Sequence, residues 1–418
     1  MKNLVIAIVL ILFLSCNNRK NGANVLFEIQ ESQQLSSSPP QHRITIDKPD
    51  EAKLTSLMLS DFVDSIRYTQ IEYTKKALLP EEGGTGLRRC KDLIFTSYSD
   101  VLYLFDSDGK FIRQYGSVGK GPGEYKLTEF DVNISQNIIL IGNYFADGYV
   151  LYNINGQHIG SVYNRDTSML RITRSQKGNP YLLNDHILEQ YYFEYKVNNE
   201  KGIPIELMLY NYRKQKKVDD ITNRFPVKTE QMIVTRRPEQ SRASVKQNDS
   251  VAFYKAFYND TLYIIKKESI LPFAIIDLGR FRIQDDLVYN LKADLTRKIG
   301  IHDLYVSNNC IYLNCYYWKG AGSAFSFLCK YDLQSKNTTY HSTRIVNNID
   351  GGADVGLKSL KSKVRAVPFS FDDEDDKWQS NLDNKLLKHP ELKQRFQTMQ
   401  NKRKENDNPL LMLLYTKE

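Results

Sequence analysis

The chain has 418 residues, of which 41 % are hydrophobic and 25 % are charged. This length suits one large domain or two ordinary ones, and the composition excludes a globally disordered chain. Tyrosine (27) and phenylalanine (19) are abundant, which favours β-structure. The net charge of +8 is spread along the whole chain without a basic block among aromatic residues, so nucleic acid is not an expected partner.

The N-terminus has the pattern of an export signal. Lys2 precedes an apolar run, Leu4–Leu14, which is 11 residues long. A bilayer span needs about 20 residues, so this run fits the apolar core of a signal peptide instead. It ends at Ser15-Cys16, before a polar stretch, and this junction resembles the lipobox of bacterial lipoproteins except that Phe13 stands where Leu is usual.

The lipobox resemblance implies a signal peptide over 1–15 and a membrane anchor through acylated Cys16. A polar tether then follows to about residue 60. The outer membrane is the expected membrane, with the body in the periplasm or at the cell surface. The alternatives are an ordinary signal peptide and a free Cys16.

The body of the chain repeats. Tyr98, Phe145 and Tyr258 each stand two residues before an Asp that leads into a strand, at 101–105, 148–152 and 261–265. The turn sequence at 106–112 matches the one at 153–159, and its Asp/Asn-x-Asp/Asn-Gly pattern is typical of a tight hairpin. Further strands end near Tyr210, Tyr331 and Tyr415, so six units of about 50 residues predict a propeller.

Four segments carry a resemblance to a known family. Residues 105–125 resemble an NHL-type repeat, as found in six-bladed β-propeller lipoproteins of bacterial envelopes. Residues 61–73, 347–352 and 406–418 resemble that family's start and finish. The resemblance implies an all-β six-bladed propeller over 61–418 and says almost nothing about activity.

The two ends of the body are expected to pair with each other. The last strand, at 409–415, leaves its sheet without an outer strand, and the segment 65–73 has no sheet of its own. Pairing them closes the ring and hides both edges.

A helical insertion is expected at about 374–405, before the last strand. Trp378, Leu382 and Leu386 recur every four residues, and a second run follows Pro390, which is expected to break the helix. The acidic stretch at 372–376 reads as a helix cap rather than a cation site.

Sequence motifs for chemistry are sparse. The glycine-rich stretch 116–123 lacks phosphate-loop spacing and is better explained as a crossover between two blades. The histidines never fall at zinc-ligand spacing, and only His186 and His302 lie where inner strands begin. The stretch 347–356 lacks the EF-hand pattern and reads as a turn. We therefore expect no catalytic residue, no metal and no cofactor.

Four further cysteines follow Cys16, namely Cys90, Cys310, Cys315 and Cys329. Buried free thiols are the favoured interpretation. A disulfide between Cys315 and Cys329 across a hairpin is the alternative.

The geometry of a four-stranded blade predicts a binding rim. Loops between the second and third strands emerge on the same face as the crossovers between blades. The candidate rim residues are Trp318, Lys319, Tyr98, Phe145, Tyr258, Lys120, Glu124 and Tyr125. Aromatic platforms beside charged groups suit sugars or peptides, although the repeated aromatics also fit packing between blades. Trp318, beside Lys319, is the preferred contact residue.

Three functions remain open. A non-catalytic propeller that binds or scaffolds a glycan, a peptide or an envelope protein is preferred. A propeller lyase or hydrolase is supported if His186 or His302 meets carboxylates at the channel mouth. A structural subunit of an outer-membrane assembly is the third.

Overall fold

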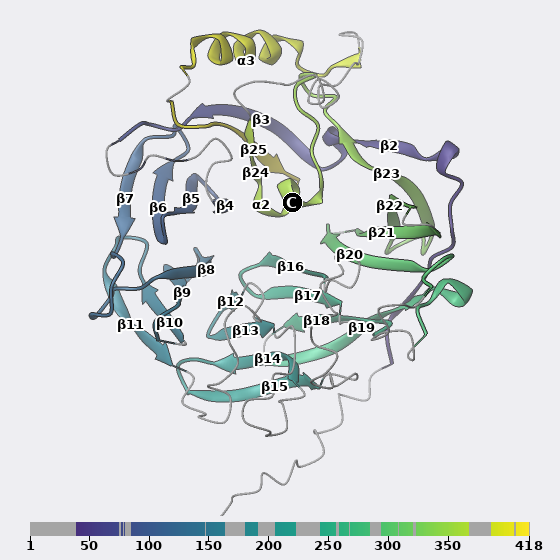
Figure 1. Ribbon diagram of the computed structural model, residues 1–418, viewed down its shortest axis with the longest axis horizontal. Coiled ribbons are helices and arrows are strands. Elements are labelled where there is room, and N and C mark those ends of the chain that lie inside the picture. Colours follow the sequence, from purple (N-terminus) through teal and green to yellow (C-terminus); the bar gives the residue numbers. More distant parts are fainter. Residues whose placement is uncertain are drawn as a thin grey trace, which may run out of the picture. The chain divides into compact units, whose positions relative to one another are not determined.

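Short apolar strands separated by tight turns determine the architecture. The computed structural model describes residues 39–74, 77, 79, 85–146, 148–163, 180–190, 205–222, 243–255, 259–266, 268–284, 294–307, 309–320, 323–367, 386–404 and 407–417. Across these residues the strands form six sheets, which stand in a ring in Figure 1. The prediction of a six-bladed β-propeller is confirmed.

The first three sheets follow one another along the chain. Blade 1 contains β4 (Thr85–Cys90), β5 (Leu93–Tyr98), β6 (Val101–Asp106) and β7 (Phe111–Tyr115). Blade 2 contains β8 (Leu127–Asn133), β9 (Ile138–Asn143), β10 (Gly148–Tyr152) and β11 (His158–Tyr163). Blade 3 contains β12 (Tyr181–Leu183), β13 (His186–Gln190), β14 (Ile205–Asn211) and β15 (Lys216–Thr222). In each blade the first strand lies nearest the centre of the ring (Figure 1).

The next two sheets each take an extra strand from the N-terminal part of the chain. Blade 4 contains β16 (Ala243–Asn248), β17 (Val251–Lys255), β18 (Thr261–Lys266), β19 (Ser269–Asp277) and, outermost, β1 (His42–Thr45). Blade 5 contains β20 (Ile299–Val306), β21 (Cys310–Gly320), β22 (Ser323–Asp332), β23 (Thr338–Val346) and, outermost, β2 (Thr55–Met58).

Both extra strands pair parallel with their neighbours. The segment 42–58, which the sequence analysis assigned to the polar tether, is therefore part of the propeller. The physical reason is burial of its few apolar side chains: Ile44, Ile46 and Leu57 pack between the blades.

Blade 6 closes the ring with strands from both ends of the chain. It contains β24 (Val364–Val367), β25 (Leu410–Thr416) and β3 (Val63–Gln70). Strand β25 pairs antiparallel with β3, from Leu410 opposite Gln70 to Thr416 opposite Val63. The predicted pairing of the terminal strands is confirmed. The helix α2 (Leu357–Ser362) contacts β4, β20 and β24 on the central side of this blade (Figure 1).

The helical insertion before the last strand is confirmed in part. The helix α3 (Pro390–Lys402) begins at Pro390. A proline in the first turn lacks only an N–H that has no helical partner there, so Pro390 starts this helix and does not break one, contrary to the expectation. Phe396 packs on Tyr68 of β3 with ring centroids 4.7 Å apart. Trp378 and Leu382 lie outside the described residues.

Among the described residues, the core is divided into six clusters, each between two neighbouring blades. Successive side chains of a strand point to opposite faces of its sheet, and both faces are covered. On β25, Met412 and Leu414 therefore pack toward blade 5, whereas Leu411 and Leu413 pack toward blade 1. This double burial explains why the third strands are nearly unbroken apolar runs.

The predicted hairpin turns form as expected. Asp106 accepts hydrogen bonds from the backbone N–H groups of Asp108 and Lys110, both at 2.9 Å, and Gly109 takes a φ of +82°. Asn153 repeats this arrangement by accepting from the N–H of Gln157 at 2.9 Å. A side chain that caps its own turn fixes the hairpin register.

Candidate functional site

Three loops of blades 1 and 2 meet on one face of the propeller. The backbone N–H of Leu127 donates to the carbonyl of Asp100 at 3.0 Å, and that of Tyr144 donates to Lys126 at 2.8 Å. These bonds join the β5–β6 turn, the β7–β8 crossover and the β9–β10 loop. Loops of these kinds thus share a face here, as the sequence geometry predicted.

This face carries an unusual concentration of exposed apolar side chains. Tyr144 is 57 % exposed, Val118 49 %, Phe145 40 % and Tyr98 38 %. Together they are half of the eight large apolar side chains that are exposed in the described part of the chain. We call these four residues, with Lys120 and Lys126, the aromatic rim.

The lysines of the aromatic rim lie over its rings. The Lys126 ammonium is 5.2 Å from the centroid of Tyr144, and that of Lys120 is 5.5 Å from the centroid of Phe145. The two rings are in edge contact, 6.1 Å apart, and Lys126 also lies 3.8 Å from the Asp100 carboxylate. The predicted residues Lys120 and Phe145 thus come together, and Tyr98 is exposed on the adjoining turn.

Two predicted rim residues have structural roles in the crossover. Tyr125 is fully buried; its hydroxyl donates to the carbonyl of Tyr115 and accepts from the N–H of Leu102 at 3.2 Å. Its assignment as a binding residue is wrong, because it fills the core between blades 1 and 2. The Glu124 carboxylate accepts from the N–H of Gly121 at 2.8 Å and so holds the loop that presents Lys120.

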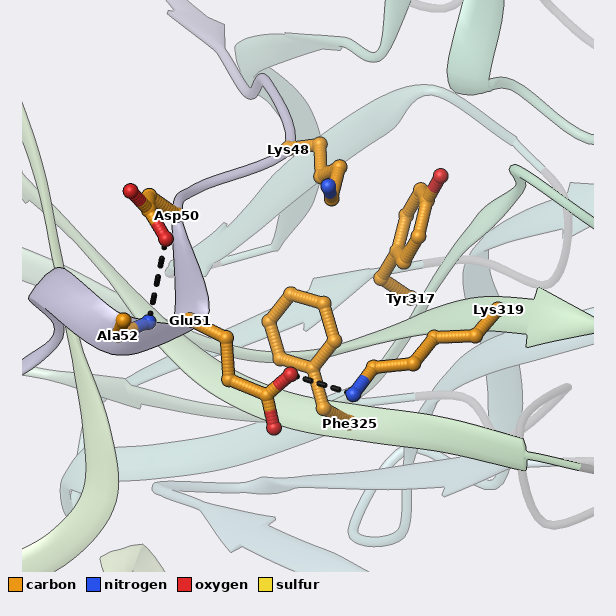
Figure 2. Close-up of a pocket in the computed structure, with 7 residues that line it drawn as sticks. All are labelled: Lys48, Asp50, Glu51, Ala52, Tyr317, Lys319 and Phe325. Atoms are coloured by element: carbon orange, nitrogen blue, oxygen red, sulfur yellow. Dashed lines mark hydrogen bonds and ion pairs between the residues drawn. The ribbon is translucent and has the colours of Figure 1, made fainter.

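Trp318 and Lys319 lie at a second place, at the end of β21 in blade 5. Trp318 is half-buried, and its backbone pairs with the segment 297–298. Lys319 forms an ion pair with Glu51 and lies 5.2 Å from the ring centroid of Phe325. Lys319, Glu51 and Phe325 line a pocket of about 470 Å³ beside the N-terminal segment, whereas Trp318 is not part of its lining (Figure 2). Blades 1 and 5 are separate parts of the ring (Figure 1), so the predicted rim divides into two sites; Tyr258 lies outside the described residues.

The two singled-out histidines have different surroundings. His186 is on β13, the second strand of blade 3, so its expected place at the start of an inner strand is wrong. It lies 3.7 Å from Glu268 and 3.1 Å from the Asn211 side-chain nitrogen. His302 is on the innermost strand β20 and stacks on Tyr316 with centroids 4.0 Å apart. Burial lowers the pKa of both imidazoles below the ordinary value of 6.5. Within the described residues, no hydrogen bond joins His302 to a carboxylate.

A buried ionic cluster links the innermost strands. Asp131 of β8 pairs with Arg88 of β4 and with Lys246 of β16, the latter at 2.9 Å. The N–H of Leu182 on β12 donates to the same carboxylate at 2.7 Å. Asp131 therefore ties four blades together, and its oxygens are engaged by these donors.

The turn predicted at 347–356 is confirmed, and its polar groups face one another. The Asp350 carboxylate accepts from the Tyr68 hydroxyl at 2.8 Å, the Asn347 amide at 2.7 Å and the Gly352 N–H at 2.9 Å. Burial raises the pKa of the Asp354 carboxyl, although Arg344 pairs with it. These contacts fasten β3 to the connection between blades 5 and 6.

Cys90, Cys310, Cys315 and Cys329 are free thiols, so the disulfide alternative is not realised. Among the described residues no group of three or more His, Cys, Asp or Glu side chains is placed to hold a metal ion. Neither α-helix of the described part is long and apolar enough to cross a membrane.

The solved structure of one Bacteroides protein supports the same fold. A solved structure of a Bacteroides fragilis protein, whose name describes it as exported, superposes with a TM-score of 0.54 at 15 % identity, over 90 % of this chain and 99 % of that one. A DUF4221 family member from Bacteroides vulgatus superposes with a TM-score of 0.46 at 8 % identity, over 85 % and 97 %. No curated protein matches the chain. The profile of a domain of unknown function, DUF4934, matches residues 43–415, and the chain belongs to that family.

Proposed function

We propose that this protein is a lipid-anchored, exported propeller that binds a peptide or protein of the cell envelope and does not catalyse a reaction. The observation that carries the proposal is the aromatic rim of blades 1 and 2. Exposed aromatic side chains on loops that a rigid scaffold holds are typical of recognition surfaces.

The lysines of the rim favour a protein partner over a glycan. A sugar ring stacks on an open aromatic face, but the Lys126 and Lys120 ammonium groups already lie over Tyr144 and Phe145. A protein surface can instead bury the ring edges and place carboxylates against the two lysines. Tyrosine and phenylalanine are also enriched in protein interfaces.

The anchor follows from the N-terminal sequence. The apolar run that ends at Ser15-Cys16 supports export and acylation, and the name of the Bacteroides fragilis protein with the same fold is consistent with export. Several acyl chains give durable attachment, which a single chain does not. We expect Cys16→Ala to release the protein from membranes and to abolish labelling by radioactive palmitate. Retention of the unlabelled Cys16→Ala variant on membranes would contradict an anchor through Cys16.

Chemical crosslinking in intact cells tests the binding surface. The rim variant Tyr144→Ser/Phe145→Ser is compared with Ile112→Ser/Ile159→Ser, which removes exposed apolar side chains from the outer strands β7 and β11. We expect the rim variant to lose its crosslinked partner at an unchanged melting temperature, whereas the control keeps it. Equal yields from both variants would refute the rim as the binding surface. If the crosslinked species contains no second protein, the ligand is reassigned to a glycan.

A further inference from the structure

The pocket in blade 5 is built by a segment that crosses from one blade to the next. Residues 46–54, here called the strap, connect β1 on blade 4 to β2 on blade 5. The strap is held by its backbone: the N–H of Ile46 donates to Asp277 at 2.9 Å, and that of Asp47 donates to the Tyr340 hydroxyl at 2.8 Å. Pro49 is buried and restricts Lys48 before it to extended backbone. The strap is thus a fixed wall.

The opposite wall is aromatic. Tyr317 on β21 and Phe325 on β22 have ring centroids 5.6 Å apart and belong to the core between blades 4 and 5. Their remaining exposed surface faces a pocket of about 470 Å³. This volume falls in the range of about 300–1,000 Å³ that small-molecule sites occupy.

The charged groups of the pocket are unequally paired. In Figure 2 the Lys319–Glu51 ion pair passes below the Phe325 ring, whereas Lys48 and Tyr317 are above it. Asp50, also on the strap, lies 3.4 Å from Lys53. The Lys48 ammonium lies 5.3 Å from the ring centroid of Tyr317. No carboxylate of the described residues forms an ion pair with Lys48.

The Tyr317 hydroxyl is a second available group. Within the described part of the chain it has no hydrogen-bond partner, and it lies at the Lys48 side of the pocket (Figure 2). An ammonium and a hydroxyl together form a donor pair suited to a carboxylate, and hydrogen bonds to ionised groups are stronger than those between neutral groups. The aromatic wall beside them suits a flat apolar face.

We propose that this pocket binds a small carboxylate that bears a ring with an apolar face. Its carboxylate pairs with Lys48 and accepts from the Tyr317 hydroxyl, and its ring contacts the side of Phe325 that lies away from the Lys319–Glu51 ion pair. Sugar acids and aromatic acids share this chemistry. The pocket is separate from the aromatic rim, so this proposal is tested independently of the partner proposed there.

Saturation-transfer NMR on the detergent-solubilised full chain tests the proposal with glucuronate and benzoate as probes. Glucose and benzyl alcohol are their uncharged counterparts. We expect one of the two acids to bind saturably and its counterpart to bind at least about tenfold more weakly, because the charge pairing is lost. Glucuronate binding identifies a sugar acid as the ligand class, and benzoate binding identifies an aromatic acid.

Variants locate the binding in the pocket. Lys48→Gln removes the ammonium and is expected to weaken the bound acid by about tenfold or more. Lys53→Gln is the matched control, because Lys53 is a strap lysine outside the pocket lining. Tyr317→Phe keeps the buried ring and is expected to weaken binding without lowering the melting temperature. The proposal is overturned if neither acid binds, if the uncharged counterpart binds equally, or if Lys48→Gln and Lys53→Gln behave alike.

Discussion

Deleting residues 409–418 removes β25 and opens the ring, and the structure sets the size of the expected loss. The five side chains from Leu410 to Leu414 are fully buried. Burying a Leu or Met side chain contributes about 1.5–3 kcal/mol, so these five contribute roughly 7–15 kcal/mol. That equals the entire net stability of a typical folded protein, about 5–15 kcal/mol. We therefore expect the truncated chain to have no cooperative unfolding transition.

Urea unfolding followed by circular dichroism measures this loss. The point variant Leu413→Ala is the graded control; it should lower the free energy of unfolding by about 2–5 kcal/mol while cooperativity is kept. A synthetic peptide of residues 409–418, added to the truncated chain, should restore a transition by pairing with β3. An unchanged urea midpoint after truncation would refute the account of ring closure.

Three further predictions concern buried polar groups. Tyr68→Phe leaves Asp350 with one donor fewer and should cost about 1–3 kcal/mol in urea unfolding, whereas an unchanged midpoint would contradict that role. Burial lowers the pKa of His302, so the folded state binds fewer protons than the unfolded state just below pH 6.5; stability should fall as pH drops through this window, and His302→Gln should flatten the dependence. Burial raises the pKa of Cys329 to about 12 and holds the pKa of Cys315 well above its ordinary range, so a thiol reagent should label neither before unfolding; rapid labelling of the native protein would refute their burial.

The sequence predicted those parts of the fold in which local pattern and tertiary burial agree. Third strands such as β6 and β10 are apolar on both faces because each faces two blades, and their Asp-Gly and Asn-Gly turns cap themselves. The closing pair was also predictable, because the sheet of β25 lacked an outer strand and β3 had no sheet of its own.

The outer strands β1 and β2 could not be found in the same way. Each has four residues, of which only one is buried (Ile44 in β1 and Leu57 in β2), and this burial exists only once blades 4 and 5 are in place. A four-residue pattern of this kind is indistinguishable from a tether when the neighbouring blade is unknown.

The candidate site shows the same limit. Phe145 and Lys120 were predicted together because they lie on loops of one face, and the structure brings them into contact. Tyr125 is a tyrosine like the exposed Tyr98 and Tyr144, but it is buried because it packs in the core between blades 1 and 2. Tyr144 was missed because it stands one position outside the repeated motif, although it adjoins Phe145 in sequence. Trp318 was predicted on the same face, and the structure places it in blade 5; strand order does not show how far apart two loops lie around a ring.

Site-specific photocrosslinking in intact cells tests the central claim most directly. A photoreactive residue replaces Val118 in the aromatic rim and, in a second strain, Ile159 on the outer strand β11, two positions of nearly equal exposure at 49 % and 53 %. The account predicts a discrete protein adduct from position 118 and none from position 159. Adducts from position 159 alone, or no adduct from either position, would contradict recognition through the rim.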